Sequence, residues 1–555
     1  MVVDGTLHGE KDSERFEKRA KLKVSSCVYV YCLAFLSSVS LASPMSESEL
    51  VRQTNFGEVE GSWAIEEEQI GVFRGVPYAK PPIGSLRWRP PQPLEDMPAR
   101  QRATEFGSAC YQPYSYNQFV WSRGEFRRGE DCLHLNIWGR LDSEKKKPVM
   151  VWFHGGAHTG GYAHVPLFDG KEFARNGVVL VTVNYRLGVW GFLAHPALSD
   201  ESENDSSGNY GLLDKIASLK WVKENIASFG GDPENVTIFG QSAGSASVCA
   251  LMTSPLAQGL FHKVIGQSAS CLNAYDSDIT GEERGHQLMT EAFGQKEHKS
   301  SDLRSIKNED LLSLKGYAKW ASSPKITVDG WVLPKPPLEV FEAGEQSKVP
   351  VLLGSLANEG LFLFPQNENL SAVEFDDYLR TTFGDGADRV KLAYAAEFDE
   401  SPGKAQHEIR TDLFMGFSMR KWAGYQSSVG QQSYLYFMDY VPPAFQMYLA
   451  ESPALSLPGG PRSAGAYHSG ELAYVFNSLS EFGEMWSKED KIMAKRMNEY
   501  WSSFAKTGKP LAESGGVWDP YQSTTHNTMQ FNLQGEQSIT VRLENYDALA
   551  SRDEI

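Results

Sequence analysis

The chain has 555 residues, with 53 basic and 70 acidic side chains and a formal net charge of −17. This acidic balance argues against nucleic acid as a partner, because phosphate binding relies on clustered lysine and arginine. The sequence has no internal repeat, no Pro/Ser-rich linker and no long block of like charges, so most of the length is expected to form one large domain.

The N-terminus has the pattern of a secretory signal peptide. Basic residues at 18–23 precede an apolar run at 27–36, and small residues follow at 40–43. This pattern predicts a signal peptide over residues 1–42, cleaved after Ala42, and a mature single domain over 43–555 that is secreted or periplasmic. A retained N-terminal membrane anchor and a cytosolic chain are the alternatives. No later segment has the roughly 18 consecutive apolar residues that a membrane span needs.

Apolar strands alternate with helical stretches along the rest of the chain. We expect strands at Val149–Phe153, Val178–Asn184, Val236–Phe239, Val264–Gln267, Val351–Gly354 and Ser433–Phe437, and helices that include Leu213–Ile226 and Ser242–Met252. Such alternation predicts an α/β fold with a mostly parallel sheet covered by helices on both faces. Two amphipathic stretches, 281–321 and 374–421, are expected to be inserted helices that roof a pocket.

The stretch 236–244 is the most informative motif. A short strand runs into Gly240-Gln241-Ser242-Ala243-Gly244, which fits the Gly-x-Ser-x-Gly pattern of a nucleophile elbow, a sharp turn from strand to helix. Such a turn presents the serine hydroxyl to a base, which must remove its proton before the oxygen can attack. Because the pattern has only three fixed positions, an ordinary Gly-rich turn is the alternative, and the flanking segments have to decide.

The other parts that acyl transfer needs also have candidates. The strand at 148–153 leads into His154-Gly155-Gly156-Ala157, which matches a loop that offers backbone N–H groups to an oxyanion. Glu359 follows the strand at 349–354, and His468 lies in a loop that opens into an apolar helix. The chain order Ser, Glu, His is the order expected of an α/β-hydrolase.

The resemblance to a known family extends well beyond these residues. It includes Phe-Arg-Gly-Val-Pro-Tyr-Ala at 73–79, Glu-Asp-Cys-Leu-His-Leu-Asn-Ile at 130–137, Asn-Tyr-Arg-Leu-Gly at 184–188 and Gly-Asn-Tyr-Gly-Leu-Leu-Asp at 208–214. From about residue 55 to about residue 533 the chain resembles the type B carboxylesterases, the cholinesterase-like family of α/β-hydrolases. The resemblance implies Ser242 as nucleophile, His468 as general base and acid, and Glu359 as the carboxylate that orients it. It also implies an oxyanion hole formed by the N–H groups of Gly156, Ala157 and Ala243.

Two residues depart from the family pattern. Ala157 stands where a third glycine is common, and its methyl group is expected to restrict access for bulky alcohol groups. Gln241 stands where many relatives carry glutamate, and a neutral amide does not attract a quaternary ammonium substrate by charge. Trp121 offers an aromatic face to such a ligand, although a single tryptophan is more often a packing residue.

Cysteines and histidines allow further expectations. Of six cysteines, Cys27 and Cys32 fall in the predicted signal peptide, which leaves four. The resemblance implies a disulfide between Cys110 and Cys132. For Cys249 and Cys271 a second disulfide and two separate buried thiols both remain open. His134 and His158 are expected to be structural, with a contact to substrate as the alternative, and no cluster has metal-ligand spacing.

The sequence therefore predicts a serine hydrolase that acts on small carboxylic esters through an acyl-enzyme, without cofactor or metal. An amidase or a lactonase with the same triad is the nearest alternative. A non-catalytic binding member of the family is the other, and the complete triad argues against it. The natural ester and the oligomeric state are left open by the sequence.

Overall fold

The computed structural model describes residues 50–95, 100–116, 120–141, 145–272, 279–294, 298–323, 325–448, 455, 457–532, 537–538 and 541–551. The described residues belong to one compact unit, Leu50–Ile555. The predicted signal peptide and its cleavage point lie outside the described residues. Among the residues described, no helix is long and apolar enough to cross a membrane.

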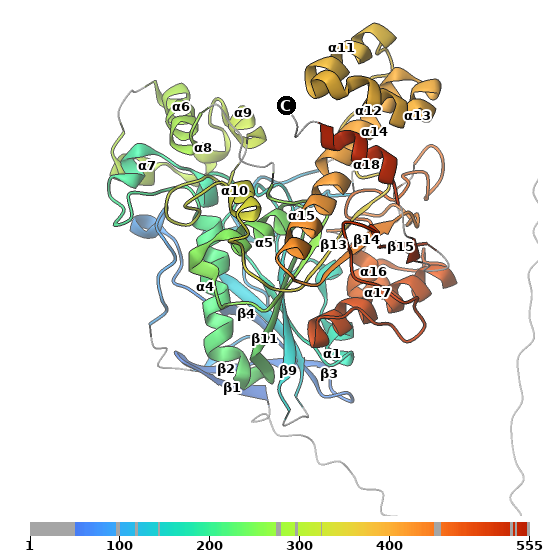
Figure 1. The fold of residues 1–555 in the computed structure, drawn as a ribbon. Helices are drawn as coiled ribbons and strands as arrows, with labels where there is room; N and C mark the ends of the chain where they lie inside the picture. The colour runs from blue at the N-terminus through green and yellow to red at the C-terminus, as the bar shows by residue number, and fades with distance from the viewer. Residues whose placement is uncertain are drawn as a thin grey trace, which may run out of the picture. The chain divides into compact units, whose positions relative to one another are not determined.

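A large mixed sheet forms the centre of this unit (Figure 1). Its strands, in spatial order, are β16 (Gln537–Ser538), β15 (Thr528–Phe531), β14 (Ser433–Met438), β13 (Val351–Leu356), β12 (Lys263–Gln267), β11 (Gly231–Gln241), β9 (Lys147–Phe153), β10 (Val179–Val183), β8 (His134–Arg140), β4 (Ile70–Pro77) and β3 (Ser62–Ile65). The strands from β10 to β15 run parallel, and antiparallel pairs extend the sheet at both ends. The expected strands are all present, which confirms the α/β-hydrolase architecture.

Short strands outside this sheet form two small ladders. They are β1 (Val51–Thr54), β2 (Gly57–Glu60) and β5 (Gln101–Arg102) in one ladder, and β6 (Ala109–Cys110) and β7 (Arg128–Gly129) in the other. In the second ladder, β6 contains Cys110 and leads to Gln112, which contacts Gly161 in the chain after β9.

The sheet separates two hydrophobic cores, and strand β9 shows why. Successive side chains of a strand point to opposite faces. Val149, Val151 and Phe153 therefore join one buried cluster, whereas Met150 and Trp152 join the other. Both sets are fully buried, because helices cover both faces of a parallel sheet.

Helices on one face include α4 and α5, and helices on the other include α16 and α17 (Figure 1). The helices between β9 and β12 are α1 (Lys171–Arg175), α2 (Gly188–Phe192), α3 (Pro196–Ser199), α4 (Tyr210–Asn225) and α5 (Ala243–Thr253). Those that follow are α6 (Gly281–Phe293), α7 (Ser300–Ser305), α8 (Asn308–Leu312), α9 (Tyr317–Ser322), α10 (Pro337–Glu342), α11 (Ala372–Phe383), α12 (Ala387–Ala393), α13 (Ala395–Glu400), α14 (Pro402–Phe414), α15 (Gly416–Ser428), α16 (Leu472–Phe476), α17 (Lys488–Thr507) and α18 (Leu543–Leu549).

The two inserted stretches are helical, as expected. Both 281–321 and 374–421 are helical, as α6–α9 and α11–α15. The described residues that line the cavity at Ser242 come from neither stretch, so the roof of inserted helices stays a prediction. Helices α11, α12, α14 and α18 instead bury their apolar faces against one another in a separate cluster.

Candidate active site

Ser242 lies at the turn between β11 and α5. Its backbone has φ 57° and ψ −125°, a conformation that a residue with a side chain rarely adopts. The turn is held because the Ser242 N–H donates to the carbonyl oxygen of Gln267 on β12 at 2.8 Å. The flanking glycines are steric requirements: a Cβ on Gly240 would lie 2.4 Å from the Gly244 carbonyl carbon, and a Cβ on Gly244 would lie 1.9 Å from the Phe153 oxygen.

His468 and Glu359 are brought together by two loops at the same end of the sheet. His468 Nδ1 lies 2.6 Å from Glu359 Oε2, and Glu359 Oε1 accepts a hydrogen bond from the Leu356 N–H at 2.8 Å. The loops are joined because Asn358 donates its N–H to the Ala466 carbonyl at 3.0 Å and accepts the Ala466 N–H at 2.9 Å. The side chains of His468 and Glu359 are both buried, so water does not weaken their contact.

The loop after β9 has backbone N–H groups available for a ligand. The Gly156 carbonyl accepts the N–H groups of Thr159 and Gly160, at 2.9 and 3.0 Å, which folds the loop back on itself. The N–H groups of Gly156 and Ala157 have no hydrogen-bond acceptor among the described residues. Ala157 has φ 53°, so the left-handed turn that glycine would favour is kept here by an alanine.

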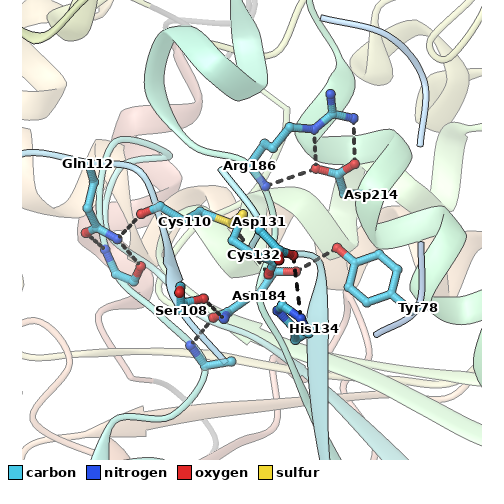
Figure 2. The surroundings of a disulfide bond; sticks show 12 residues. Tyr78, Ser108, Cys110, Gln112, Asp131, Cys132, His134, Asn184, Arg186 and Asp214 are labelled. Atoms are coloured by element: carbon cyan, nitrogen blue, oxygen red, sulfur yellow. Dashed lines mark hydrogen bonds and ion pairs between the residues drawn. A yellow bond between two sulfur atoms is a disulfide. The ribbon is translucent and has the colours of Figure 1, made fainter. Parts of the chain in front are cut away.

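His154 supports this loop from below. Its ring stacks on Tyr185 with centroids 4.4 Å apart, and its Nδ1 lies 2.8 Å from the Gly155 carbonyl oxygen. Burial lowers the pKa of His154 to about 3, so the ring is neutral and donates from Nδ1 to that carbonyl. Arg186 follows Tyr185 in the chain. It forms a buried bidentate ion pair with Asp214 on α4, at 2.8 and 2.7 Å (Figure 2).

A disulfide-closed segment braces the other end of the loop. Cys110 and Cys132 are disulfide-bonded, and Gln112 lies two residues beyond Cys110 (Figure 2). The fully buried Gln112 side chain pairs with both backbone groups of Gly161: its Oε1 accepts the N–H and its Nε2 donates to the carbonyl, each at 2.7 Å. Nε2 also donates to the Cys110 carbonyl at 3.0 Å. The segment thereby positions the chain just after the loop.

The second cysteine pair is also bonded. Cys249 on α5 and Cys271 after β12 form a disulfide, so of the two alternatives the structure has the bridge rather than two separate thiols. It links the helix that begins at Ala243 to the segment that follows β12, the strand that accepts the Ser242 N–H.

A cavity of about 430 Å³ joins these parts. Ser242, His468, Gly156 and Ala157 line it, Glu359 lies behind His468, and Ala243 opens helix α5. Its other lining residues are Ser115, Trp121, Arg123, Gly155, Thr159, Phe168, Gln241, Phe362, Leu363, Met447, Tyr448, Ser469 and Leu472. The sequence therefore identified the residues that meet at one site. His134 and His158 are not among the lining residues.

Trp121 and Gln241 both face the imidazole of His468. The Trp121 ring lies edge-on to the His468 ring at 5.9 Å between centroids, so this tryptophan is a wall of the cavity. Gln241 Nε2 lies 3.1 Å from His468 Nε2. The residue before the serine thus touches the histidine directly, and it does so with a neutral amide.

Sequence reasoning missed three residues near this site. Gln112 and Arg123 lie in a stretch with no recognisable pattern. The one signal that could have found them is that they follow Cys110 and Trp121 closely in the sequence. Glu471 is fully buried, accepts from Gln267 Nε2 at 3.0 Å, and lies near Glu359. Burial, with a smaller contribution from the Glu359 charge, raises the pKa of Glu471 to about 8.

Comparisons with known proteins show the family of this chain. The profile of the carboxylesterase family matches residues 48–548. The chain is 33% identical to a fumonisin B1 esterase of Sphingopyxis macrogoltabida over 515 residues, covering 91% of each chain. It is also 33% identical to a para-nitrobenzyl esterase of Bacillus subtilis over 490 residues, covering 86% of this chain and 93% of that one.

Solved structures give the same result. A crystal structure of a Geobacillus stearothermophilus carboxylesterase superposes with a TM-score of 0.77 at 31% identity, covering 90% of this chain and 100% of the other. A PNB esterase superposes with a TM-score of 0.75 at 30% identity, with the same coverage. The chain therefore belongs to the carboxylesterase family and is a carboxylic ester hydrolase.

Proposed function

We propose that Ser242, His468 and Glu359 form the catalytic triad of this esterase and that the reaction passes through an acyl-enzyme. Ser242 Oγ attacks the ester carbonyl carbon while His468 Nε2 takes its proton. Glu359 accepts Nδ1–H, which keeps the lone pair on Nε2 and stabilises the imidazolium. The N–H groups of Gly156, Ala157 and Ala243 bind the oxygen that becomes negative.

Product release follows from the same groups. The imidazolium gives its proton to the leaving alcohol oxygen, and the C–O bond of the ester breaks. A water molecule then attacks the acyl-enzyme, with His468 taking its proton and returning it to Ser242 Oγ. The reaction consumes one water, releases one acid and one alcohol, and needs no further co-reactant.

One observation carries the proposal: a histidine held by a carboxylate at 2.6 Å lines the same cavity as the elbow serine and the loop with two available N–H groups. An orienting carboxylate, a base, a nucleophile and oxyanion donors are the parts that acyl transfer requires. A binding protein has no need to keep all of them.

The proposal is tested with the variant Ser242→Ala and the control Ser247→Ala. Ser247 lies on α5, the helix that follows Ser242, and its hydroxyl donates to the Ala243 carbonyl at 2.8 Å. We expect Ser242→Ala to lower kcat on p-nitrophenyl acetate by a factor on the order of 10⁴ to 10⁶, and Ser247→Ala to retain it. A product burst equal to the enzyme concentration and organophosphate labelling of the Ser242 peptide are also expected. A wild-type rate in Ser242→Ala refutes the assignment.

A panel of substrates separates ester from amide and lactone hydrolysis. The triad chemistry alone does not distinguish a leaving alcohol from a leaving amine, so we compare kcat/KM for matched esters, anilides and lactones. An ester rate that exceeds the others supports the proposal.

We also propose that the enzyme is exported and cleaved after Ala42. Two disulfides are compatible with an oxidising compartment. N-terminal sequencing of the enzyme recovered outside the producing cell is expected to begin at Ser43. A chain that keeps residues 1–42 contradicts the proposed cleavage.

A further inference from the structure

The wall of the cavity contains an arginine that nothing in the proposed mechanism uses. Arg123 lines the cavity together with Ser242 and Gly156, and it is partly buried. Its guanidinium lies against the loop after β9: a Cβ on Gly160 would be 2.9 Å from Cζ, and one on Gly156 would be 3.2 Å from Nη2. The guanidinium carbon also lies over the Tyr448 ring, 4.8 Å from its centroid.

The described residues provide no counter-ion for this guanidinium. None of their carboxylates forms an ion pair with Arg123, and its buried Nε has no hydrogen-bond partner among them. Arginine normally satisfies a buried or half-buried guanidinium with carboxylate or phosphate oxygens, and it presents a planar fork of donors that fits a carboxylate. A partner for this group is therefore missing from the part of the protein that the structure describes.

None of the described residues that line the cavity carries a negative charge. Arg123 is the one formally charged side chain among its described lining residues, leaving His468 aside. Glu359 is committed to His468 and to the Leu356 N–H, and Gln241 is a neutral amide. A site whose fixed charge is positive discriminates in favour of anionic ligands, because the low-dielectric walls strengthen that charge.

We propose that this esterase acts on esters that carry a free carboxylate, and that Arg123 binds that carboxylate while Ser242 attacks the ester carbonyl. This inference rests on the proposed function of Ser242. Because the guanidinium contacts Gly156 and Gly160, the acid group lies a short chain away from the scissile carbonyl. Half esters of short dicarboxylic acids are the chemical class that fits.

The test compares two ethyl esters of nearly equal size, monoethyl glutarate and its neutral half amide, ethyl 4-carbamoylbutanoate. The measured quantity is the ratio of kcat/KM for the acid to kcat/KM for the amide, obtained from ethanol release. We expect the acid-to-amide ratio of kcat/KM to be about 10 in the wild type. We expect Arg123→Gln to lower this ratio by about 10- to 100-fold. Arg123→Lys, which keeps the charge without the fork, should restore part of it. The exposed Arg380→Gln is the matched control and should keep the wild-type ratio.

A purely structural role for Arg123 gives a different result. If the guanidinium only supports the loop, Arg123→Gln lowers kcat/KM for both esters by the same factor and the ratio does not move, which overturns the inference. A wild-type ratio of one or less also overturns it.

A binding measurement gives an answer that does not depend on turnover of the half esters. We expect glutarate to inhibit wild-type hydrolysis of p-nitrophenyl acetate at about tenfold lower concentration than glutaramide, and to lose that advantage in Arg123→Gln. Equal inhibition by both compounds in the wild type overturns the inference. Failure of the proposed function appears separately, as full activity of Ser242→Ala on p-nitrophenyl acetate.

Discussion

Replacing Gln112 by alanine is expected to lower both stability and turnover. The change removes three hydrogen bonds, two to Gly161 at 2.7 Å and one to Cys110 at 3.0 Å. Gly161 is buried, so its N–H and carbonyl lose their only partners in the described structure. An unsatisfied buried polar group costs about 1–3 kcal/mol, so the free energy of unfolding should fall by about 2–6 kcal/mol.

Turnover should fall because Gly161 ends the loop that contains Gly156 and Ala157. A displacement of about 1 Å in a catalytic group can lower a rate by about 10²-fold, so we expect kcat on p-nitrophenyl acetate to fall by about 10- to 100-fold. Urea unfolding, monitored by tryptophan fluorescence, gives the free energy of unfolding. Initial rates at urea concentrations far below the unfolding midpoint give kcat.

A second buried glutamine provides the control. Gln346 is 1% exposed, and its Nε2 donates to Gln426 Oε1 at 3.2 Å, away from the lining of the cavity. Gln346→Ala should lower stability and leave kcat within about twofold of the wild type. If Gln112→Ala loses no more stability than Gln346→Ala and keeps full turnover, the Gln112 side chain does not position the loop that contains Gly156 and Ala157, and the prediction is wrong.

Three other changes have clear expected outcomes. Ala157→Gly relaxes a residue at φ 53°, so it should raise the unfolding free energy by about 0.5–1 kcal/mol. Loss of the methyl group should also raise the ratio of tertiary to primary ester turnover. An unchanged ratio contradicts the steric argument. For Glu471 the ordinary pKa is 4.5 and the pKa in the folded protein is about 8, so the folded state holds the extra proton between these values. Stability should therefore fall by about 1.4 kcal/mol per pH unit from this group as the pH rises through that window. Urea midpoints measured from about pH 5 to about pH 8 should fall less steeply in Glu471→Gln than in the wild type, and parallel slopes would count against the assignment. Asp214→Asn leaves Arg186 buried beside a neutral amide and should lower the unfolding free energy by about 3–5 kcal/mol in the same urea assay, whereas a loss below about 1 kcal/mol would show that water or another group replaces the ion pair.

The sequence was sufficient for the parts of the site that follow from local chain geometry. Ser242 lies between a strand and a helix whose patterns are both readable, and the glycines beside it are required by close approaches of the backbone. The strands that position Glu359 and the loop after β9 are continuous apolar runs, which parallel strands buried on both faces normally are. The order of these elements then predicted that they meet at one edge of the sheet.

Other parts of the site depend on contacts between distant segments, which a single sequence does not show. Gln112 acquires its role by meeting Gly161, and Arg123 by lying against Gly160, and neither residue has a pattern of its own. The pairing of Cys249 with Cys271 was left open for the same reason, since connectivity is set by the fold. The inserted helices were assigned to the pocket because they are amphipathic, but an apolar helical face packs equally well against another helix.

The crowding around Ser242 decides where new substrate preferences can arise. Positions 240 and 244 admit no side chain, since a Cβ at either would run into backbone atoms, so the turn that presents Ser242 cannot be varied at these two positions. The walls are different. Trp121, Phe362 and Tyr448 reach the cavity from loops outside the sheet, where exchange of a side chain leaves the hydrogen-bonded ladder intact. Libraries that diversify these three positions, with the glycines left untouched, should yield altered ester selectivity in a large fraction of folded members.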